Sequence, residues 1–178
     1  MRVGVTGTPG SGKTTATDLL ESSLADATDL PTLDVVHLNE VLEREGFYTE
    51  VDADRESKVA DLDALADWLD GEDDIVIESH LAHHFDADRV AVLRCRPDEL
   101  ERRLRERGET EAKARENAES EALDVILAEA VEEHGPEAVY EIETTDRSPE
   151  EIANELAAVI TGDREPSAGE VDYVGYFQ

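Results

Sequence analysis

Cysteine, lysine and aromatic residues are scarce in this chain, and long apolar runs are missing. Cys95 is the only cysteine, so no disulfide can form within the chain. No apolar run approaches the roughly 18 residues that a membrane-spanning helix needs, and the first residues lead into a short apolar segment without a signal-peptide pattern. We therefore expect a cytoplasmic protein that does not bind membranes, in which Cys95 is a buried thiol ending the apolar run 90–93.

Positive charge is also scarce. The 178 residues include 46 acidic residues against 16 lysines and arginines, which gives a formal net charge of −30. Such a composition is typical of disordered chains or of chains with a basic partner. Here, however, the acids alternate with regularly spaced apolar positions, and the chain is long enough to bury one core. We expect a folded domain adapted to a high-salt cytoplasm, with a functional acidic surface as the alternative. No basic and aromatic patch indicates direct nucleic-acid binding.

A glycine-rich segment, Gly7–Thr14, fits the P-loop pattern G-x-x-x-x-G-K-[ST]. It lies between a predicted strand at 2–6 and a predicted helix at 14–24, which is the context that this motif requires. A glycine-rich turn with an accidental lysine is the alternative, and this context argues against it. The segment predicts that the chain binds a nucleoside triphosphate.

The residue types in this segment suit phosphate chemistry. Glycines such as Gly10 and Gly12 let the backbone turn tightly and direct its N–H groups onto an anion at the positive end of a helix. Lys13 supplies a mobile positive charge for the β- and γ-phosphates, and the Thr14 hydroxyl is placed to bind Mg²⁺. ATP and Mg²⁺ are therefore the expected ligands.

Short apolar runs alternate with helical patterns along the rest of the chain. This alternation predicts an α/β protein, a P-loop NTPase with a doubly wound, five-stranded parallel sheet whose ligands bind beyond the carboxyl ends of the strands. Residues 39–55 are polar and weakly periodic, which indicates a short helix and a mobile loop. The predicted strands are 2–6, 33–38, 74–79, 89–94 and 138–142, and the predicted helices are 14–24, 57–69, 97–107, 111–133 and 149–160.

Polar residues follow the predicted third strand. Glu78 ends the apolar run 75–77, where a carboxylate can hold Mg²⁺ directly or through water; a solvated strand-end acid is the alternative. His80 could orient a water or a phosphate. His83 and His84 complete a His-x-x-His-His pattern that could bind a metal, but no further ligands cluster with it in the sequence, so both are expected on a loop surface.

Seven of the 13 arginines fall between residues 94 and 115. On the predicted helix 97–107 several of them have an acid four residues away, which indicates a surface with weak salt bridges. Arg107 has no acid one turn before it and precedes Gly108, where we expect a loop that also carries Lys113 and Arg115. Free cations on a mobile loop beside a P-loop suit the lid of a phosphoryl-transfer enzyme.

Together these segments resemble the adenylate kinase isoenzyme 6 family, which includes the coilin-interacting nuclear ATPase proteins and their archaeal counterparts. The resemblance covers about residues 1–160. It rests on the P-loop with its preceding strand, on Ile77-Glu78-Ser79-His80, and on the stretch 107–117 followed by an acidic and apolar helix. The chain departs from the family pattern at Glu78, where aspartate is expected, and at Leu81, where glycine is expected.

The resemblance implies a broad-specificity nucleoside monophosphate (NMP) kinase with an ATPase activity. It also implies a role in maturation of the small ribosomal subunit and its pre-16S rRNA, through transient binding of a basic ribosomal protein. It divides the chain into a kinase domain, 1–161, with an NMP-binding segment at about 30–53 and a lid at about 107–117, and a linker with an aromatic tail, 162–178.

The motifs and the resemblance together assign site residues to this sequence. Lys13, Arg107 and His80 would be catalytic, and Thr14 and Glu78 would hold Mg²⁺. The residues that would bind ATP are Gly10, Gly12, Lys13, Thr14, Thr15, Arg107 and, near the adenine, Ser148.

Two other functions stay open from the sequence. The chain could be an ATP-hydrolysing assembly factor with incidental kinase activity, in which His80 holds the attacking water. It could also be a P-loop kinase for another small acceptor, such as shikimate or dephospho-coenzyme A. Formation of ADP that depends on added AMP would indicate the NMP kinase, whereas phosphate release without an NMP would indicate the hydrolase.

The charge leads to a prediction about salt. Repulsion among the acidic side chains is largely screened at molar salt, where the Debye length is about 3 Å. We therefore expect the melting temperature, followed by circular dichroism, and the activity to fall as KCl is lowered from molar to millimolar concentration. Full activity and an unchanged melting temperature in salt-free buffer would contradict the adaptation to salt.

Overall fold

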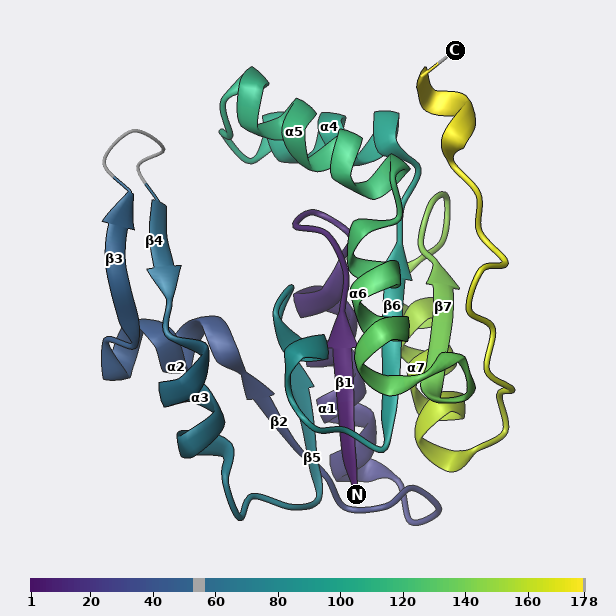
Figure 1. The fold of residues 1–178 in the computed structure, drawn as a ribbon. Helices are drawn as coiled ribbons and strands as arrows, with labels where there is room; N and C mark the ends of the chain where they lie inside the picture. The colour runs from purple at the N-terminus through teal and green to yellow at the C-terminus, as the bar shows by residue number, and fades with distance from the viewer. Residues whose placement is uncertain (53–56, 178) are drawn as a thin grey trace.

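The computed structural model describes residues 1–52 and 57–177 (Figure 1). Its main sheet has five parallel strands in the order β2-β5-β1-β6-β7, which confirms the predicted doubly wound α/β fold. The central strand β1 leads directly into the P-loop. The strands are β1 Arg2–Thr6, β2 Asp34–His37, β5 Ile75–Glu78, β6 Arg89–Arg94 and β7 Val139–Glu143.

Helices cover both faces of the sheet, as the alternation of side chains along a strand requires. Ala91 and Leu93 of β6 face α1 and α7, whereas Val90 and Val92 face α6. In Figure 1, α6 lies in front of the sheet and α1 and α7 lie behind it. The bounds of these helices are α1 Lys13–Asp26, α6 Val125–His134 and α7 Pro149–Thr161.

The region after β2 differs from the prediction. A hairpin and two short helices form here: α2 Leu38–Glu45, β3 Tyr48–Asp52, β4 Ser57–Ala60 and α3 Leu62–Leu69. The helix predicted at 57–69 is therefore wrong over its first residues. Asp61 caps α3 by accepting a hydrogen bond from the amide of Ala64 at 3.0 Å, so the helix starts one turn later. Part of the mobile loop expected at 39–55 lies outside the described residues.

The single helix predicted at 111–133 is two helices, α5 Glu111–Ala122 and α6. Asp124 breaks it with a left-handed backbone (φ 55°), and its carboxylate accepts a hydrogen bond from Arg94. The helical pattern over 111–133 predicts Leu123 on the core face of that helix, which is wrong, because Leu123 is 63% exposed. The hydrogen bond from Arg94, which comes from a distant strand, stabilises this break, and no local sequence pattern reveals it.

The loop expected after Gly108 is also mostly helical. Helix α4, Pro97–Glu106, ends at Arg107, and α5 begins three residues after Gly108, capped by Thr110. Lys113 and Arg115 therefore lie on a helix, and each pairs with an acid four residues away, Glu109 and Glu119. The prediction that they are free cations is wrong.

The C-terminal segment from residue 162 packs along β7 and reaches α4 and α5 (Figure 1). The carboxylate of Glu141 accepts hydrogen bonds from the amides of Glu170 and Val171, at 2.7 and 3.3 Å. The ring of Tyr173 lies 5.3 Å from the Arg94 guanidinium carbon, and its hydroxyl donates to Glu143. Burial and that hydrogen bond raise the pKa of Tyr173. The tail is therefore part of the folded domain.

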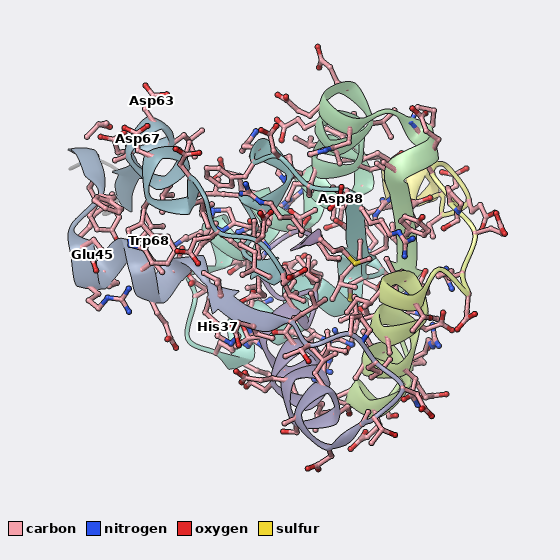
Figure 2. The ribbon with its side chains drawn as sticks, turned by 90° about the horizontal axis from the view of Figure 1, so that it is seen from below. His37, Glu45, Asp63, Asp67, Trp68 and Asp88 are labelled. Atoms are coloured by element: carbon pink, nitrogen blue, oxygen red, sulfur yellow. The ribbon has the colours of Figure 1, made fainter. Side chains whose placement is uncertain are left out.

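Most acidic side chains project into solvent. Figure 2 shows Asp63 and Asp67 extending outward from α3, on the far side of that helix from the sheet. Across residues 1–52 and 57–177, no helix combines the length and apolar character needed to cross a membrane. Among the described acids, three are buried: Glu78, Glu121 and Glu141.

Two of these buried acids surround Arg94, which is itself only 1% exposed. Its Nε donates to Glu121 at 2.8 Å, and its terminal nitrogens pair with Glu141 and Asp124. Burial alone would lower the pKa of Arg94, but these carboxylates outweigh it and raise the pKa, so the guanidinium is always charged. The cluster joins β6, β7 and the junction of α5 with α6.

We expect Arg94→Met to lower the free energy of unfolding by about 3–5 kcal/mol, because it leaves buried carboxylates without a counter-charge. Urea unfolding at molar KCl measures this change. Arg102→Met is the matched control, since Arg102 is exposed and pairs with Glu99 and Glu106 on the same helix. Equal effects of the two substitutions would show that the buried cluster contributes nothing special.

Candidate active site

The P-loop follows β1 and opens α1. Its glycines Gly7, Gly10 and Gly12 all have positive φ, at 142°, 91° and 96°. A Cβ on Gly7 would lie 2.5 Å from the backbone oxygen of Leu93, which cannot move away. At Gly12, the N-cap of α1, a Cβ would meet no described atom within 4 Å. The first amides of α1 have no acceptor within the helix, and such amides at a helix N-terminus can bind phosphate.

Lys13 turns back over this loop. Its Nζ donates to the backbone oxygens of Gly7 and Thr8, at 2.7 and 3.2 Å, and the residue is 7% exposed. Burial lowers the pKa of Lys13 to about 8; Glu78 and Glu121 oppose this shift, and the charge of Arg107 adds to it. Lys13 is therefore a cation held at the loop within electrostatic range of Arg107.

Thr14 and Glu78 face each other beside Lys13. The Thr14 hydroxyl lies 3.5 Å from Glu78 Oε1, and Glu78 is 5% exposed. The other carboxylate oxygen lies 2.7 Å from Nδ1 of His37. Two hard oxygen donors on facing elements fit Mg²⁺, which prefers oxygen ligands.

His37 is a site residue that the sequence reasoning missed. Its Nε2 lies 3.4 Å from Asp18, so the imidazole bridges two carboxylates. Burial acts to lower the pKa of His37, but the hydrogen bond and charge of Glu78 outweigh it and raise the pKa. The available signal was its position near the end of a predicted strand, since carboxyl ends of parallel strands meet at one edge.

His80 lies between the P-loop and a groove. Burial lowers the pKa of His80 to about 4, and the charge of Lys13 contributes to the shift, so the imidazole is neutral at physiological pH. The groove has a volume of about 450 Å³, a size that suits a small molecule. It is lined by α2, the β3–β4 hairpin and the turn after β5: Asn39, Leu42, Glu43, Tyr48, Lys58, Ala60, His80 and Leu81.

Helix α4 lies above the P-loop in the view of Figure 1, and one of its arginines contacts that loop. Arg103 Nη1 donates to the backbone oxygen of Gly10 at 3.5 Å, while its Nε pairs with Glu99. From the sequence, Arg103 is expected only to pair with Glu99, because an acid four residues away on a helix accounts for its charge. Arg107 is exposed, and its guanidinium has no hydrogen-bond or ion-pair partner among the described residues.

Glu121 ties the P-loop to α5. Its Oε2 accepts a hydrogen bond from the Thr8 hydroxyl at 2.5 Å, and its Oε1 accepts from Arg94 and from the amide of Cys95. The sequence reasoning missed this buried acid, although it shares a helix face with Ala114 and Ala118. Burial raises the pKa of the Cys95 thiol to about 11, which confirms an inert strand-end cysteine.

Comparison of the sequence with known protein families identifies the family of this chain. A family model described as "AAA domain" matches residues 3–124, which is more than half of the chain. The chain belongs to the AAA domain family. Within it, a relative named "Putative adenylate kinase" from Natronomonas pharaonis is 60% identical over 97% of this chain and 98% of its own length. A protein of the same name from Halobacterium salinarum is 56% identical over 99% of both chains.

Solved structures agree with the fold. A shikimate kinase from Bacteroides thetaiotaomicron aligns with a TM-score of 0.57 over 90% of this chain and 98% of its own, at 21% sequence identity. At that identity the likeness shows the fold alone. It confirms that this AAA domain protein has the P-loop kinase arrangement of strands and helices.

Two predicted site residues of this AAA domain protein lie in the first turns of helices. Thr15 is exposed in the first turn of α1. Ser148 caps α7: its hydroxyl accepts from the amide of Glu151 at 3.2 Å, and its own amide donates to the Glu151 carboxylate. The pattern Ser148-Pro149-Glu150-Glu151 predicts a capping box, and these two reciprocal hydrogen bonds confirm it. A contact between Ser148 and adenine stays a prediction.

His83 does not lie on a loop surface as the sequence suggested. It sits in a short 3₁₀ turn, Ala82–His84, that folds under β1, and it is 1% exposed. Its two ring nitrogens contact Thr6 and Glu129. Polarity alone predicted an exposed position, whereas tertiary hydrogen bonds satisfy the ring in the interior.

The lowered pKa of Lys13 predicts proton uptake on ATP binding. At pH 9 the free enzyme has mostly lost the proton of Lys13, and a bound triphosphate restores it, so binding should take up about one proton and weaken as pH rises. At pH 7 the lysine is already charged and uptake is small. Calorimetry at both pH values, in buffers of different ionisation enthalpy, measures the uptake.

Lys58→Arg is the matched control for this titration, because Lys58 lines the groove outside the P-loop and should leave the uptake unchanged. An ATP affinity that stays constant between pH 7 and pH 9, without proton uptake, would contradict the assignment to Lys13.

Proposed function

We propose that this protein is a broad-specificity nucleoside monophosphate kinase, which transfers the γ-phosphoryl group of ATP to an NMP. The observation that carries the proposal is that the P-loop and the groove adjoin through His80, which lines the groove and interacts electrostatically with Lys13. The P-loop kinase fold and the names of the relatives support a phosphotransferase. The resemblance to the adenylate kinase isoenzyme 6 family supports the choice of NMP as acceptor.

In this proposal, residues 1–161 form the kinase domain, and the acceptor binds in the groove. The NMP-binding segment at about 30–53 supplies α2 and β3, and the second hairpin strand adds Lys58. The Lys58 ammonium lies 4.6 Å from the centre of the Tyr48 ring, so a cation and an aromatic face adjoin in the groove. Such a pair suits a ligand that carries both a phosphate and a base.

Catalysis then depends on positioning and on charge. An NMP phosphate is already ionised at neutral pH, so its oxygen attacks without a general base. The first amides of α1 and Lys13 stabilise the charge on the transferring group. Thr14 and Glu78 would hold Mg²⁺, which neutralises phosphate charge when bound. His37 fixes the Glu78 carboxylate by a 2.7 Å hydrogen bond and so orients it toward Thr14.

Arg107 is the lid cation in this mechanism. It caps the end of α4, where Gly108 turns the chain with a φ of 92°, and its guanidinium is free to move toward bound phosphate. Closure of the segment 107–117 over the P-loop would add this charge and exclude water. The electrostatic effect of Arg107 on Lys13 supports a short path to the phosphate.

A second function, ATP hydrolysis, has an observation of its own. The neutral imidazole of His80 lies within electrostatic range of Lys13. A neutral imidazole can orient a water molecule by accepting a hydrogen bond from it. The family resemblance extends this activity to a cytoplasmic role in maturation of the small ribosomal subunit. The same resemblance supplies a basic ribosomal protein as the transient partner.

The experiment measures ADP and inorganic phosphate separately at molar KCl, with ATP, Mg²⁺ and a panel of acceptors. The panel contains AMP, GMP, CMP, UMP, shikimate and dephospho-coenzyme A. We expect ADP formation that depends on an added NMP. Phosphate release that no acceptor changes would establish the hydrolase instead, and the highest rate with a non-nucleotide acceptor would overturn the choice of NMP.

Variants separate the roles of the cations. We expect Lys13→Ala to abolish turnover and Arg107→Ala to lower kcat about a hundredfold with little change in the Kd for ATP, because the lid charge acts on the transition state. Arg105→Ala is the matched control: Arg105 is also exposed on α4, and it pairs with Glu101 at 4.0 Å. Loss of ATP affinity without loss of kcat in Arg107→Ala would contradict its catalytic role.

A further inference from the structure

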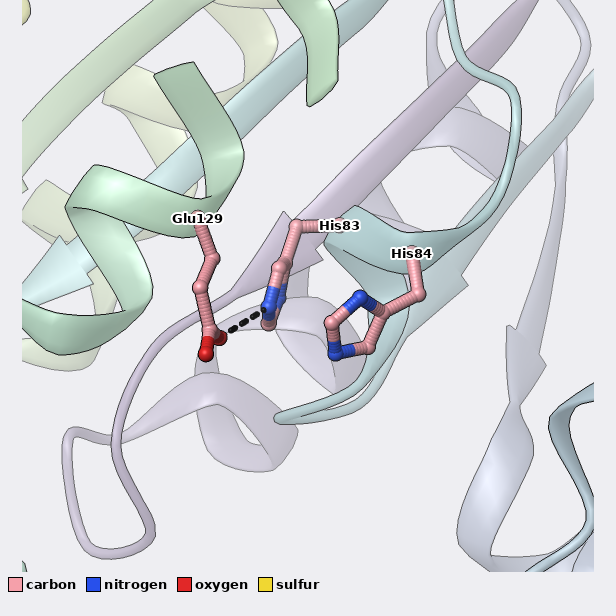
Figure 3. A group of neighbouring side chains, drawn as sticks. All are labelled: His83, His84 and Glu129. Carbon is pink, nitrogen blue, oxygen red and sulfur yellow. Dashed lines mark hydrogen bonds and ion pairs between the residues drawn. The ribbon is translucent and has the colours of Figure 1, made fainter. Parts of the chain in front are cut away.

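Three potential metal ligands cluster outside the proposed active site. His83 and His84 come from the 3₁₀ turn after β5, and Glu129 comes from α6. One ligand atom from each residue lies within 4.8 Å of the other two. Figure 3 shows the His83 ring pointing toward the Glu129 carboxylate, with the His84 ring beside it. Glu129 lies 46 positions after His83 in the sequence, so only the fold brings it to the two histidines.

His83 is oriented as a metal-binding imidazole would be. Its Nδ1 lies 2.8 Å from the Thr6 hydroxyl, and its Nε2 lies 2.9 Å from Glu129 Oε2. In the tautomer whose Nδ1–H donates to Thr6, the lone pair of Nε2 points at the Glu129 carboxylate, and a bound cation would satisfy both groups. Hydrogen bonding of the second ring nitrogen commonly fixes the orientation of a ligating histidine in this way.

His84 supplies the second nitrogen. Its ring centre lies 4.1 Å from that of His83, with an angle of 43° between the planes. Among residues 1–52 and 57–177, its imidazole has no hydrogen-bond or ion-pair partner, so a ring nitrogen is available. Donor atoms around a tetrahedral Zn²⁺ are about 3.3 Å apart, given metal–nitrogen bonds of 2.0–2.1 Å. Small rotations of His84 and of Glu129, whose side chain is 45% exposed, would close the set around the fixed His83.

A histidine–carboxylate hydrogen bond alone is the competing explanation of this pair. It accounts for His83 and Glu129 but gives no role to His84. The backbone of the turn is also held independently, since Nε2 of His134 lies 2.7 Å from the His83 backbone oxygen. A second contact from α6 therefore anchors the backbone of the turn beside the His83–Glu129 pair.

We propose that His83, His84 and Glu129 bind one divalent transition-metal ion, best matched by Zn²⁺, with water in the remaining position. Two imidazoles and a carboxylate suit Zn²⁺, whereas Mg²⁺ prefers oxygen ligands, so the Mg²⁺ of the nucleotide site would not compete. The exposed side of Glu129 gives the ion a path from solvent. The site does not depend on the proposed kinase function.

Metal binding here would clamp α6 to the turn beneath the P-loop. Thr6, which contacts His83, is the last residue of β1 and directly precedes Gly7. The same turn follows His80. The ion would thus hold the base of the P-loop, and its expected contribution is structural.

The test uses the full chain, freed of metal by a chelator, at molar KCl without phosphate or nucleotide. Titration with Zn²⁺ against a chromogenic chelator should show one tight equivalent, and Zn²⁺ should raise the melting temperature. Co²⁺ in place of Zn²⁺ should give the visible absorption of a tetrahedral nitrogen and oxygen site. Glu129→Gln and His84→Ala should each weaken Zn²⁺ binding at least tenfold; both residues are partly exposed, so the variants should fold.

Glu133→Gln is the matched control, because Glu133 is an exposed acid of the same helix. It should bind Zn²⁺ as the wild type does. Binding that is weak in the wild type, or equally tight in Glu129→Gln and His84→Ala, would overturn the proposal and assign any Zn²⁺ uptake to the acidic surface or to the nucleotide site.

Discussion

The buried cluster around Arg94 is the interaction on which the rest of the structure depends. One guanidinium on β6 pairs with carboxylates from β7, from α5 and from the break before α6. Through Glu121 it reaches the Thr8 hydroxyl of the P-loop, and through Glu141 it reaches the C-terminal segment. Because a buried charge must be paired, an arrangement that separates these elements would leave buried charges of the cluster without partners.

The cluster also shows how an acidic chain uses its few cations. Each of the three lysines lies in a segment with a proposed role: Lys13 in the P-loop, Lys58 in the groove and Lys113 in the lid segment. Lys58 and Lys113 pair with acids, at 3.5 Å to Glu43 and 3.3 Å to Glu109, whereas Lys13 donates to backbone oxygens of the P-loop. Of the acids around the P-loop, Glu78 is held by His37 and Glu121 by Arg94. Both are therefore prevented from neutralising Lys13 directly.

Several contacts that define the candidate site join residues far apart in the chain. Thr8 and Glu121 are separated by 113 positions, and His37 and Glu78 by 41. Glu121 appeared in the sequence as one acid among many on an acidic helix, and Arg103 as half of a local salt bridge. Neither the helical period nor the charge pattern carries information about a partner on another element, so these two roles were missed.

The sequence by itself determined the P-loop, the five parallel strands and the capping box at Ser148, because each depends on residues within one short segment. Positive-φ glycines, short apolar runs and cap hydrogen bonds are all local. Only the tertiary structure decided the hairpin at Tyr48–Ala60, the break at Asp124 and the burial of His83. In each of these the local preference is weak, and the conformation follows from packing or from a hydrogen bond that the fold supplies from elsewhere in the chain.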